Sequence, residues 1–348
     1  MDPDVAALVA KINKRYGDNT LILASDVPPP PRYPSGSLSL DIALGGGWPA
    51  NQWAEVIGQE SSGKTAVVLK TVAANQAADP AFTAWWVAAE GYDEAWAASL
   101  GVDNNRVLLH MTCSMEEAYA GMLDAARSRA VDAVILDSYP ALIADLEEEK
   151  GMDELQVAIG ARLTGKFFRK AGAATARSLA GTERPLLGLV INQWRDKIGG
   201  FSPQGTPRTS PGGNAKNYAY FVRVEVSRAD YIDETRPGKG AARVGQVIKA
   251  RTIKNKSAAP HKIATVDFYF DDAPLLGFRQ GDYDTAKELI TMGVLYEAIE
   301  RAGAYYTVAG ERVKGKDALL DLLRGDLTTQ EHLRGDILGR AFPMKEVR

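Results

Sequence analysis

The stretch Gly58-Gln59-Glu60-Ser61-Ser62-Gly63-Lys64-Thr65 fits the pattern G-x-x-x-x-G-K-[ST] of a loop that wraps nucleotide phosphates. Its glycines let backbone N–H groups surround the phosphates, and the start of the following helix adds partial positive charge. Lys64 can reach the β- and γ-phosphates, and the Thr65 hydroxyl can ligate Mg²⁺. An apolar run at residues 53–57 precedes the loop and a helical segment at 64–78 follows it. The segment therefore predicts a nucleoside-triphosphate site on a strand, a loop and a helix.

The chain around this loop alternates short apolar runs with helical segments. Runs that predict strands lie at residues 53–57, 83–89, 107–110, 131–136 and 186–192, with helices such as 64–78 and 114–129 between them. Near-continuous apolar strands separated by helices favour a parallel sheet covered on both faces. Three later runs without intervening helices, at 221–227, 243–254 and 265–270, would extend the sheet with antiparallel pairing. We expect an α/β fold with a mostly parallel central sheet at residues 34–270.

Two smaller parts flank this expected core. Residues 1–33 combine a helix with apolar spacing (Val5, Leu8), a strand at 20–24 and a proline-rich spacer. Such an element cannot bury its own apolar face, so we expect it to dock on the core or on a neighbouring subunit. Residues 271–348 predict a small α+β C-terminal domain, with helices at 284–302, 316–323 and 328–338 and a strand at 304–308.

Charge is distributed unevenly along the chain. The net charge is −3, yet residues 195–262 hold 14 Lys or Arg against 5 Asp or Glu. A basic stretch in an acidic protein is typical of a polyanion site, although a solvated basic face is the alternative. One cysteine, Cys113, rules out an intramolecular disulfide. The single cysteine favours a reducing cytoplasm, and without an apolar run of membrane length we expect no membrane partner.

Polar residues follow three of the expected strands. Asp137 would lie beside the phosphate loop and hold Mg²⁺ through water. Glu90 could orient and deprotonate an attacking water, and a helix-capping acid is its alternative role. Gln193 could sense the γ-phosphate or be an ordinary loop residue. Lys254 and Lys256, at period two, point to one face, which predicts either a solvated edge or a phosphate contact from this subunit or a neighbour.

Several segments, taken together, resemble the bacterial RecA family of DNA strand-exchange recombinases. They are Gly36-Ser37-Leu38-Ser39-Leu40-Asp41-Ile42-Ala43-Leu44-Gly45, the phosphate loop, Asn192-Gln193-Trp194-Arg195-Asp196-Lys197-Ile198-Gly199, Gly212-Gly213-Asn214-Ala215 and Lys254-Asn255-Lys256-Ser257-Ala258-Ala259-Pro260. Their order and spacing match the family from about residue 5 to residue 310. The motifs in register are more specific than a phosphate loop alone.

The resemblance implies a RecA-type P-loop ATPase core and a homologous recombinase that uses ATP and Mg²⁺. Such a protein forms a helical filament on single-stranded DNA, pairs it with double-stranded DNA and hydrolyses ATP when DNA is bound. A hexameric RecA-fold helicase and a non-catalytic regulatory paralogue remain alternatives. The N-terminal element and the Lys254–Lys256 segment argue against the first, and the complete ATPase residue set argues against the second.

The resemblance also implies roles for single residues. Glu90 matches the catalytic glutamate, Trp96 an aromatic residue that stacks on adenine, and Asp93 a residue near the base. Gln193 matches the amide that couples ATP to DNA, and the two lysines match residues that reach ATP bound by the adjacent subunit. The DNA loops would be residues 147–157 and 194–213. Residues expected to contact DNA are Arg162, Arg169, Arg195, Lys197, Ile198, Gly199, Arg208, Gly212, Gly213 and Asn214.

Three departures from the family pattern stand out. The second loop contains Pro203, Pro207 and Pro211. Lys216-Asn217-Tyr218 stands where the family often has Leu-Lys-Phe, so the lysine has moved by one position. The sequence ends Lys345-Glu346-Val347-Arg348, without the acidic tail of many members. If that tail restrains DNA binding, we expect less restraint here.

Overall fold

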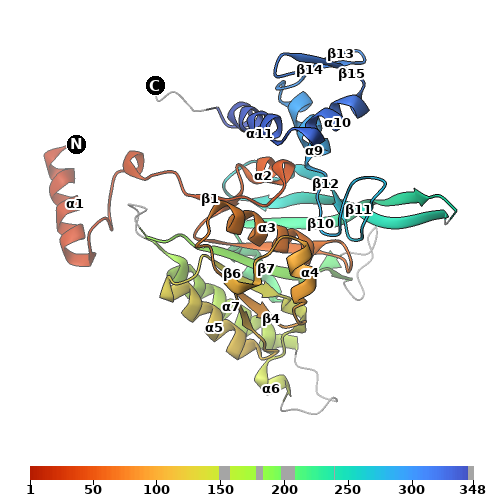
Figure 1. Ribbon diagram of the computed structural model, residues 1–348. Coiled ribbons are helices and arrows are strands. Elements are labelled where there is room, and N and C mark those ends of the chain that lie inside the picture. Colours follow the sequence, from red (N-terminus) through yellow and green to blue (C-terminus); the bar gives the residue numbers. More distant parts are fainter. Residues whose placement is uncertain (149–156, 178–182, 197–207, 239, 344–348) are drawn as a thin grey trace.

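The computed structural model describes residues 1–148, 157–177, 183–196, 208–238 and 240–343. Within these residues, eight strands form one central sheet in the order β12-β11-β10-β3-β7-β6-β4-β5 (Figure 1). The strands are β3 (Gln52–Gly58), β4 (Ala84–Ala88), β5 (Val107–His110), β6 (Ala133–Asp137), β7 (Leu187–Gln193), β10 (Val222–Arg236), β11 (Gly240–Asn255) and β12 (Ile263–Tyr269). All eight coincide with runs that the sequence predicts as strands, although β10 extends well beyond its run.

The sheet is parallel from β10 to β5 and antiparallel at β11 and β12. The α/β prediction with a mostly parallel sheet is thereby confirmed. The strand before the phosphate loop, β3, lies between β10 and β7 near the middle of the sheet. Because parallel strands end at one edge, this arrangement brings the segments after β3, β4, β6 and β7 together.

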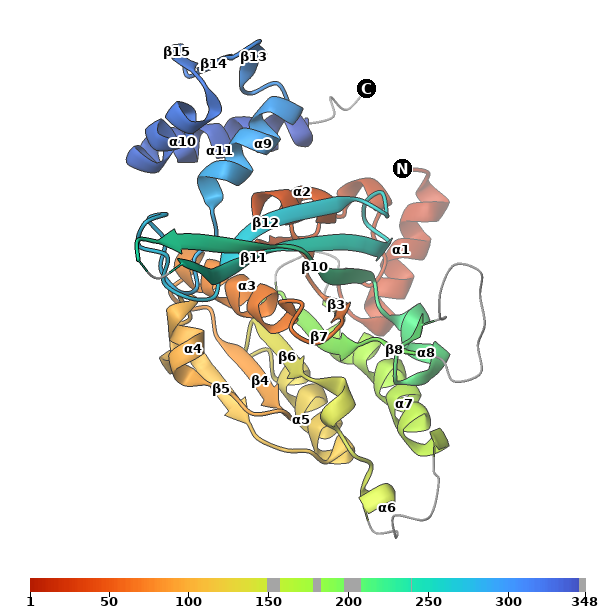
Figure 2. The same ribbon diagram turned by 90° about the vertical axis from the view of Figure 1, so that its right-hand side faces the viewer.

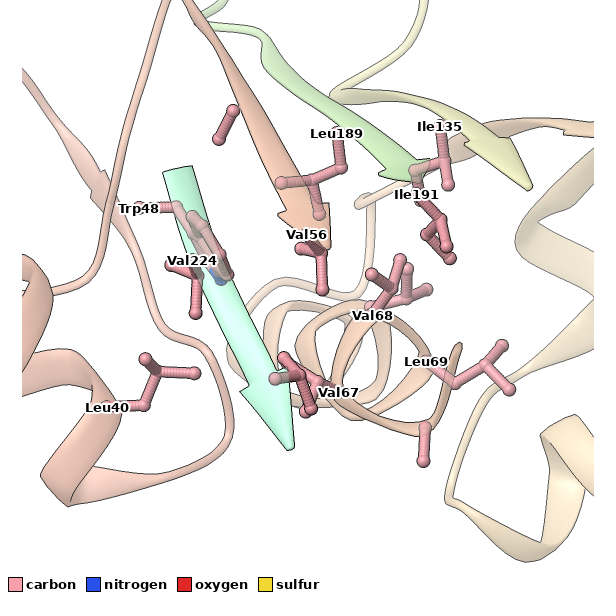
Figure 3. Close-up of a cluster of buried hydrophobic side chains, with 14 of the residues drawn as sticks. Leu40, Trp48, Val56, Val67, Val68, Leu69, Ile135, Leu189, Ile191 and Val224 are labelled. Atoms are coloured by element: carbon pink, nitrogen blue, oxygen red, sulfur yellow. The ribbon is translucent and has the colours of Figure 1, made fainter. Parts of the chain in front are cut away.

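Helices cover both faces of the sheet. Successive side chains of each strand point to opposite faces, so one strand can contribute to two apolar clusters. Val56, Ile135 and Leu189 are buried on the side of α3 (Lys64–Ala78), in the cluster of Figure 3. Val134 and Val190 belong to a second cluster, which the helices α5 (Met115–Ser128) and α7 (Val157–Thr175) complete. The double cover explains the near-continuous apolar strands of the sequence.

Shorter elements connect these layers. They are α2 (Leu38–Leu44), α4 (Glu94–Ser99), α6 (Asp145–Glu148), α8 (Gly213–Ala219), the strand pair β1 (Arg32–Tyr33) and β2 (Trp48–Pro49), the strand pair β8 (Arg195–Asp196) and β9 (Arg208–Thr209), and single turns at Ala24–Asp26 (η1), Asn104–Arg106 (η2) and Tyr139–Ala141 (η3). Helix α8 lies beside α7, since a Cβ built on Gly213 would approach the Ala161 side chain to 3.1 Å (Figure 2). The second expected DNA loop therefore leads into a helix that packs on α7.

The N-terminal helix α1 (Pro3–Tyr16) stands apart from the sheet (Figure 1). It buries no residue, and Val5 and Leu8 are 43% and 54% exposed. The strand expected at residues 20–24 is wrong, because a single 3-10 turn, Ala24–Asp26, forms there. The Asn13 side chain bonds both the N–H and the carbonyl of Leu21, and so takes the groups that a ladder would use.

The C-terminal elements build a separate apolar cluster. They are α9 (Thr285–Leu295), β13 (Glu300–Ala302), β14 (Tyr305–Val308), β15 (Glu311–Lys314), α10 (Lys316–Gly325) and α11 (Leu327–Ala341). Leu38 and Ile42 of α2 are buried in the same cluster. The helix expected at 284–302 ends early at Leu295, because residues 300–302 pair with β14 instead. A domain boundary at residue 270 stays a prediction.

No helix within the described ranges is long and apolar enough to cross a membrane.

Candidate functional site

The phosphate loop begins where β3 ends, and its two glycines are needed for close approach. A Cβ on Gly58 would lie 2.1 Å from the Val226 carbonyl oxygen, and one on Gly63 would lie 2.8 Å from Ile248 Cδ1. Gly63 also has a φ of +95° and precedes the first residue of α3. The loop is thus held against β10 and β11, with the N-terminus of α3 facing the position expected for the phosphates.

A cleft of about 410 Å³ opens beside this loop. Its lining residues are Ser61, Ser62, Gly63, Lys64, Thr65, Ala66, Trp96, Arg228, Tyr231, Gln246, Phe268 and Phe270. The Ser62 hydroxyl is buried and has no hydrogen-bond partner. Buried polar atoms normally have a hydrogen-bond partner. An unpaired hydroxyl in this glycine-dependent loop therefore fits a bound phosphate. The aromatic residues at the other side of the cleft suit a base.

Thr65 and Asp137 lie together, as the sequence predicts. Thr65 Oγ1 donates to Asp137 Oδ2 over 3.1 Å. The pKa of Asp137 is raised to about 6, mainly by burial and in part by the charge of Glu90. The Thr65 hydrogen bond and the charge of Lys64 oppose this rise. Burial likewise lowers the pKa of Lys64, and the three nearby carboxylates oppose this. A hydroxyl at the start of α3 and a carboxylate at the end of β6 could hold Mg²⁺, with water completing its shell.

Glu90 lies close to this pair. The backbone N–H of Glu90 donates to the Asp137 carbonyl over 3.3 Å, because β4 and β6 are neighbours. Its exposed carboxylate accepts a hydrogen bond from the Ser138 hydroxyl. An exposed carboxylate beside the expected metal position can bind and orient a water. Within the described ranges, no group of three or more His, Cys, Asp or Glu side chains could hold a metal by itself.

Gln193 contacts the phosphate loop directly. Its Nε2 donates to Glu60 Oε1 over 2.9 Å, and Gly58 pairs with Gln193 across β3 and β7. Lys64 Nζ donates to the Gln59 carbonyl over 2.6 Å inside the same loop. Gln193 is therefore bonded directly to the loop expected to hold the phosphates.

The two residues expected near the base have different surroundings. Trp96 lines the cleft and packs edge-on against Phe268 at 6.1 Å. Asp93 is the N-cap of α4, where it accepts from the Trp96 N–H over 2.9 Å, and it does not line the cleft. Sequence reasoning missed the lining residues Arg228, Tyr231, Gln246, Phe268 and Phe270. Their strands are remote in sequence, and no motif marks them.

Lys254 and Lys256 lie away from this chain's own phosphate loop. Lys254 pairs with Arg223, which pairs with Glu55, three residues before Gly58 on β3. At about 3.3 Å per residue, this offset is roughly 10 Å along the sheet. Both ammonium groups instead donate to carbonyls at the C-terminus of α8. The structure does not bring the two lysines to the expected phosphates of this chain.

The residues expected to contact DNA fall into three groups. Arg162 and Arg169 are exposed and lie two turns apart on α7. Arg195 and Arg208 are exposed in the paired strands β8 and β9. Gly212, Gly213 and Asn214 begin α8, and both glycines have positive φ. Lys197, Ile198, Gly199 and most of the first loop lie outside the described residues. The groups that can be described meet around α7 and α8.

Comparisons with known proteins agree with this geometry. The family model of the RecA N-terminal domain matches residues 4–273. The protein named Protein RecA of Frankia casuarinae is 35% identical over 322 residues, 91% of this chain and 86% of that protein. Protein RecA of Chlorobaculum parvum is 32% identical over 335 residues, 94% of this chain and 90% of that protein. With a family model over most of its length and relatives of this identity and coverage, the chain belongs to the RecA family.

Proposed function

We propose that this protein is an ATP-dependent homologous recombinase that forms a helical filament on single-stranded DNA. In this proposal it pairs that strand with homologous double-stranded DNA in the cytoplasm and hydrolyses ATP when DNA is bound. The observation that carries it is the hydrogen bond between Gln193 and Glu60, which joins the phosphate loop to the segment leading into the second DNA loop. Membership of the RecA family supports the assignment.

ATP would lie in the cleft beside the phosphate loop. Backbone N–H groups of residues 58–65 and the N-terminus of α3 would hold its phosphates, with Lys64 as their counter-charge. Trp96 would contact the base. Thr65 and Asp137 would hold Mg²⁺, which neutralises charge on the β- and γ-phosphates when it is bound. Asp93 would act indirectly, by capping the helix that carries Trp96.

Glu90 would orient the attacking water and accept its proton. Its carboxylate stands beside Asp137 and is fixed by Ser138. Gln193 would respond to the γ-phosphate and pass the change into the second loop. Lys254 and Lys256 would complete the site of an adjacent subunit, which their distance from this chain's own loop supports. Cations supplied in trans stabilise charge at the transferred phosphoryl group.

DNA would be held mainly by its backbone. The exposed arginines of α7, β8 and β9 could neutralise phosphates, and N–H groups at the start of α8 could bind one. We propose the residues expected from sequence as the contact set, including Lys197, Ile198 and Gly199. The exposed apolar side chains of α1 would pack on the next subunit. In this proposal residues 1–33 form the docking element, residues 34–270 the core and residues 271–348 the C-terminal domain.

A strand-exchange assay with ATP, combined with ATPase rates and electron microscopy, tests the proposal. We expect single-stranded DNA to stimulate ATP hydrolysis, joint molecules to form and helical filaments to be visible. Lys64→Ala should reduce turnover by about 100-fold or more, because it removes the phosphate counter-charge. Lys70→Ala, on the same helix but bonded to the Gly281 carbonyl, is the control. Closed rings would indicate a helicase instead, and ATP binding without turnover or joint molecules would indicate a regulatory paralogue.

A further inference from the structure

The lysine that departs from the family pattern, Lys216, has its side chain inside the protein. Both Lys216 and Glu55 have fully buried side chains, and Lys216 Nζ lies 3.2 Å from Glu55 Oε1. The same ammonium group donates to Asn217 Oδ1 over 3.1 Å and to Ser210 Oγ. Lys216 belongs to α8, Glu55 to β3 and Ser210 to the end of the second expected DNA loop. One side chain thus joins three segments.

Glu55 is shared by further donors. Arg223 Nε donates to its Oε2 over 2.6 Å, and Asn192 Nδ2 donates to its Oε1 over 2.8 Å. One carboxylate therefore faces two cations in the interior. Burial lowers the pKa of Lys216, and the charge of Glu55 opposes this shift. Buried ions are tolerated only where their hydrogen bonds are satisfied, so the cluster favours one arrangement of its three segments.

The cluster adjoins the contact between Gln193 and the phosphate loop. Asn192 Oδ1 accepts from the Gln193 N–H over 2.8 Å, and Asn192 Nδ2 also donates to the Pro211 carbonyl over 3.3 Å. Gln193 binds Glu60, which is five residues after Glu55. The bonds form a closed circuit from Glu55 through the phosphate loop, Gln193 and Asn192 back to Glu55. These bonds offer a route by which a shift of Gln193 can reach Glu55.

The opposite end of α8 holds the two lysines expected to act on a neighbour's ATP. Lys254 Nζ donates to the carbonyls of Asn217 and Tyr218, over 2.6 Å and 3.2 Å, and Lys256 Nζ donates to Tyr218 over 3.4 Å. The helix spans only Gly213–Ala219, and Lys216 at its middle is its buried side chain. The C-terminal carbonyls of α8 thus help to set the positions of both ammonium groups.

We propose that Lys216 is a positioning residue, whose buried contact with Glu55 transmits the state of the phosphate loop to α8. A shift at Gln193 then moves the end of the second DNA loop on one side and Lys254 and Lys256 on the other. The proposal rests on the proposed function for its DNA readout, and its nucleotide readout needs no DNA. A merely structural role would lower stability without changing the response of α8 to nucleotide.

The test uses the full chain and hydrogen exchange of peptides covering residues 208–219, with and without a non-hydrolysable ATP analogue. In the wild type we expect the analogue to change exchange of this segment by about fivefold or more. Lys216→Met keeps the length of the side chain and removes its charge, and it should reduce this response to below about twofold. Lys216→Arg should restore much of the response, because it retains the cation.

Lys70→Met is the matched control, since Lys70 is another largely buried lysine, whose ammonium group bonds the Gly281 carbonyl. It should leave the exchange response of residues 208–219 unchanged. Ser210→Ala removes one contact of Lys216 at a partly buried position and should give an intermediate response. It decides the question if Lys216→Met does not fold. DNA-stimulated ATP turnover should fall by about tenfold in Lys216→Met while the rate without DNA stays within about twofold.

A normal exchange response in Lys216→Met and Ser210→Ala would overturn the inference, as would a wild-type segment 208–219 that ignores the analogue. Equal loss of the two ATPase rates would also contradict it. The proposed function fails separately, if the wild type binds the analogue but DNA neither stimulates turnover nor forms joint molecules. In that case the exchange experiment still decides whether Lys216 transmits the nucleotide state.

Discussion

Gln193 Nε2 donates to Glu60 Oε1 over 2.9 Å, so the last residue of β7 is bonded to the phosphate loop. The two residues are far apart in sequence, and they meet because β3 and β7 are adjacent parallel strands that end at the same edge. The contact needs no ligand. In the proposed function, a bound γ-phosphate would compete with Glu60 for the Gln193 amide.

Gln193→Ala should therefore uncouple DNA from ATP turnover. We expect the stimulation of the ATPase rate by single-stranded DNA to fall by about tenfold, because coupling energies of this kind are about 1–3 kcal/mol. The rate without DNA should change little, since the truncation leaves Lys64, Glu90 and Asp137 in place. Gln59→Ala, at an exposed loop position whose backbone rather than side chain binds Lys64, is the control. Stimulation that persists in Gln193→Ala would contradict this role.

Glu288 on α9 caps α2 of the core, and its loss should destabilise the protein. Its Oε2 accepts from the Leu38 N–H over 2.9 Å, its Oε1 accepts from the Ser39 N–H over 2.9 Å, and the Ser37 hydroxyl donates to it as well. Glu288→Ala leaves these buried donors without a partner, so we expect a loss of about 3 kcal/mol in the free energy of unfolding. Urea titration measures it.

Glu311→Ala is the control for this change, because Glu311 is exposed in the C-terminal sheet. It should alter the free energy of unfolding by less than about 0.5 kcal/mol. Glu288→Gln should lie between the two, since the amide keeps an acceptor but loses the charge. A Glu288→Ala protein as stable as the Glu311→Ala protein would mean that α2 finds other partners.

Sequence patterns predicted the central sheet well and the cleft only in part. The strand that includes Ile135 is apolar on both faces, which is expected only of a strand covered on both sides. The phosphate-loop motif in turn predicts the strand before it and the helix after it. Tyr231 carries no such signal, because it reaches the cleft through the pairing of a long strand with β11. The expected strand at 20–24 failed because Asn13 binds the backbone of Leu21, and no periodicity encodes such a contact.

The Asp41 carboxylate should make stability depend on pH. Its pKa is raised to about 6, mainly by burial and in part by the charge of Glu288. Hydrogen bonds from Ser35 and the charge of Arg334 oppose this rise. A carboxyl whose pKa is higher in the folded than in the unfolded protein stabilises the fold at pH below about 4, and this contribution is lost as pH rises through about 6. The wild type should thus lose stability over this window relative to Asp41→Asn.

Urea titrations of both proteins at about pH 4.5 and pH 7 measure this difference. We expect the free energy of unfolding of the wild type minus that of Asp41→Asn to fall by about 2 kcal/mol, since about 1.5 pKa units lie within this pH window at about 1.4 kcal/mol each. Asp137, whose pKa burial also raises to about 6, is present in both proteins and cancels. A difference that does not vary with pH would show that Asp41 keeps an ordinary pKa.

Tyr231 should contribute to nucleotide binding, although no motif includes it. Its ring lines the cleft, and the guanidinium carbons of Arg228 and Arg243 lie 4.1 Å and 3.7 Å from its centroid. Tyr231→Ala removes this ring and frees both arginines, so we expect the dissociation constant for ATP to rise about three- to tenfold, the value of one aromatic contact. Tyr305→Ala, which removes a similar ring beside Arg312 in the C-terminal sheet, should bind ATP like the wild type. Equal affinities of the two variants would place the nucleotide on the other side of the cleft, against Trp96 alone.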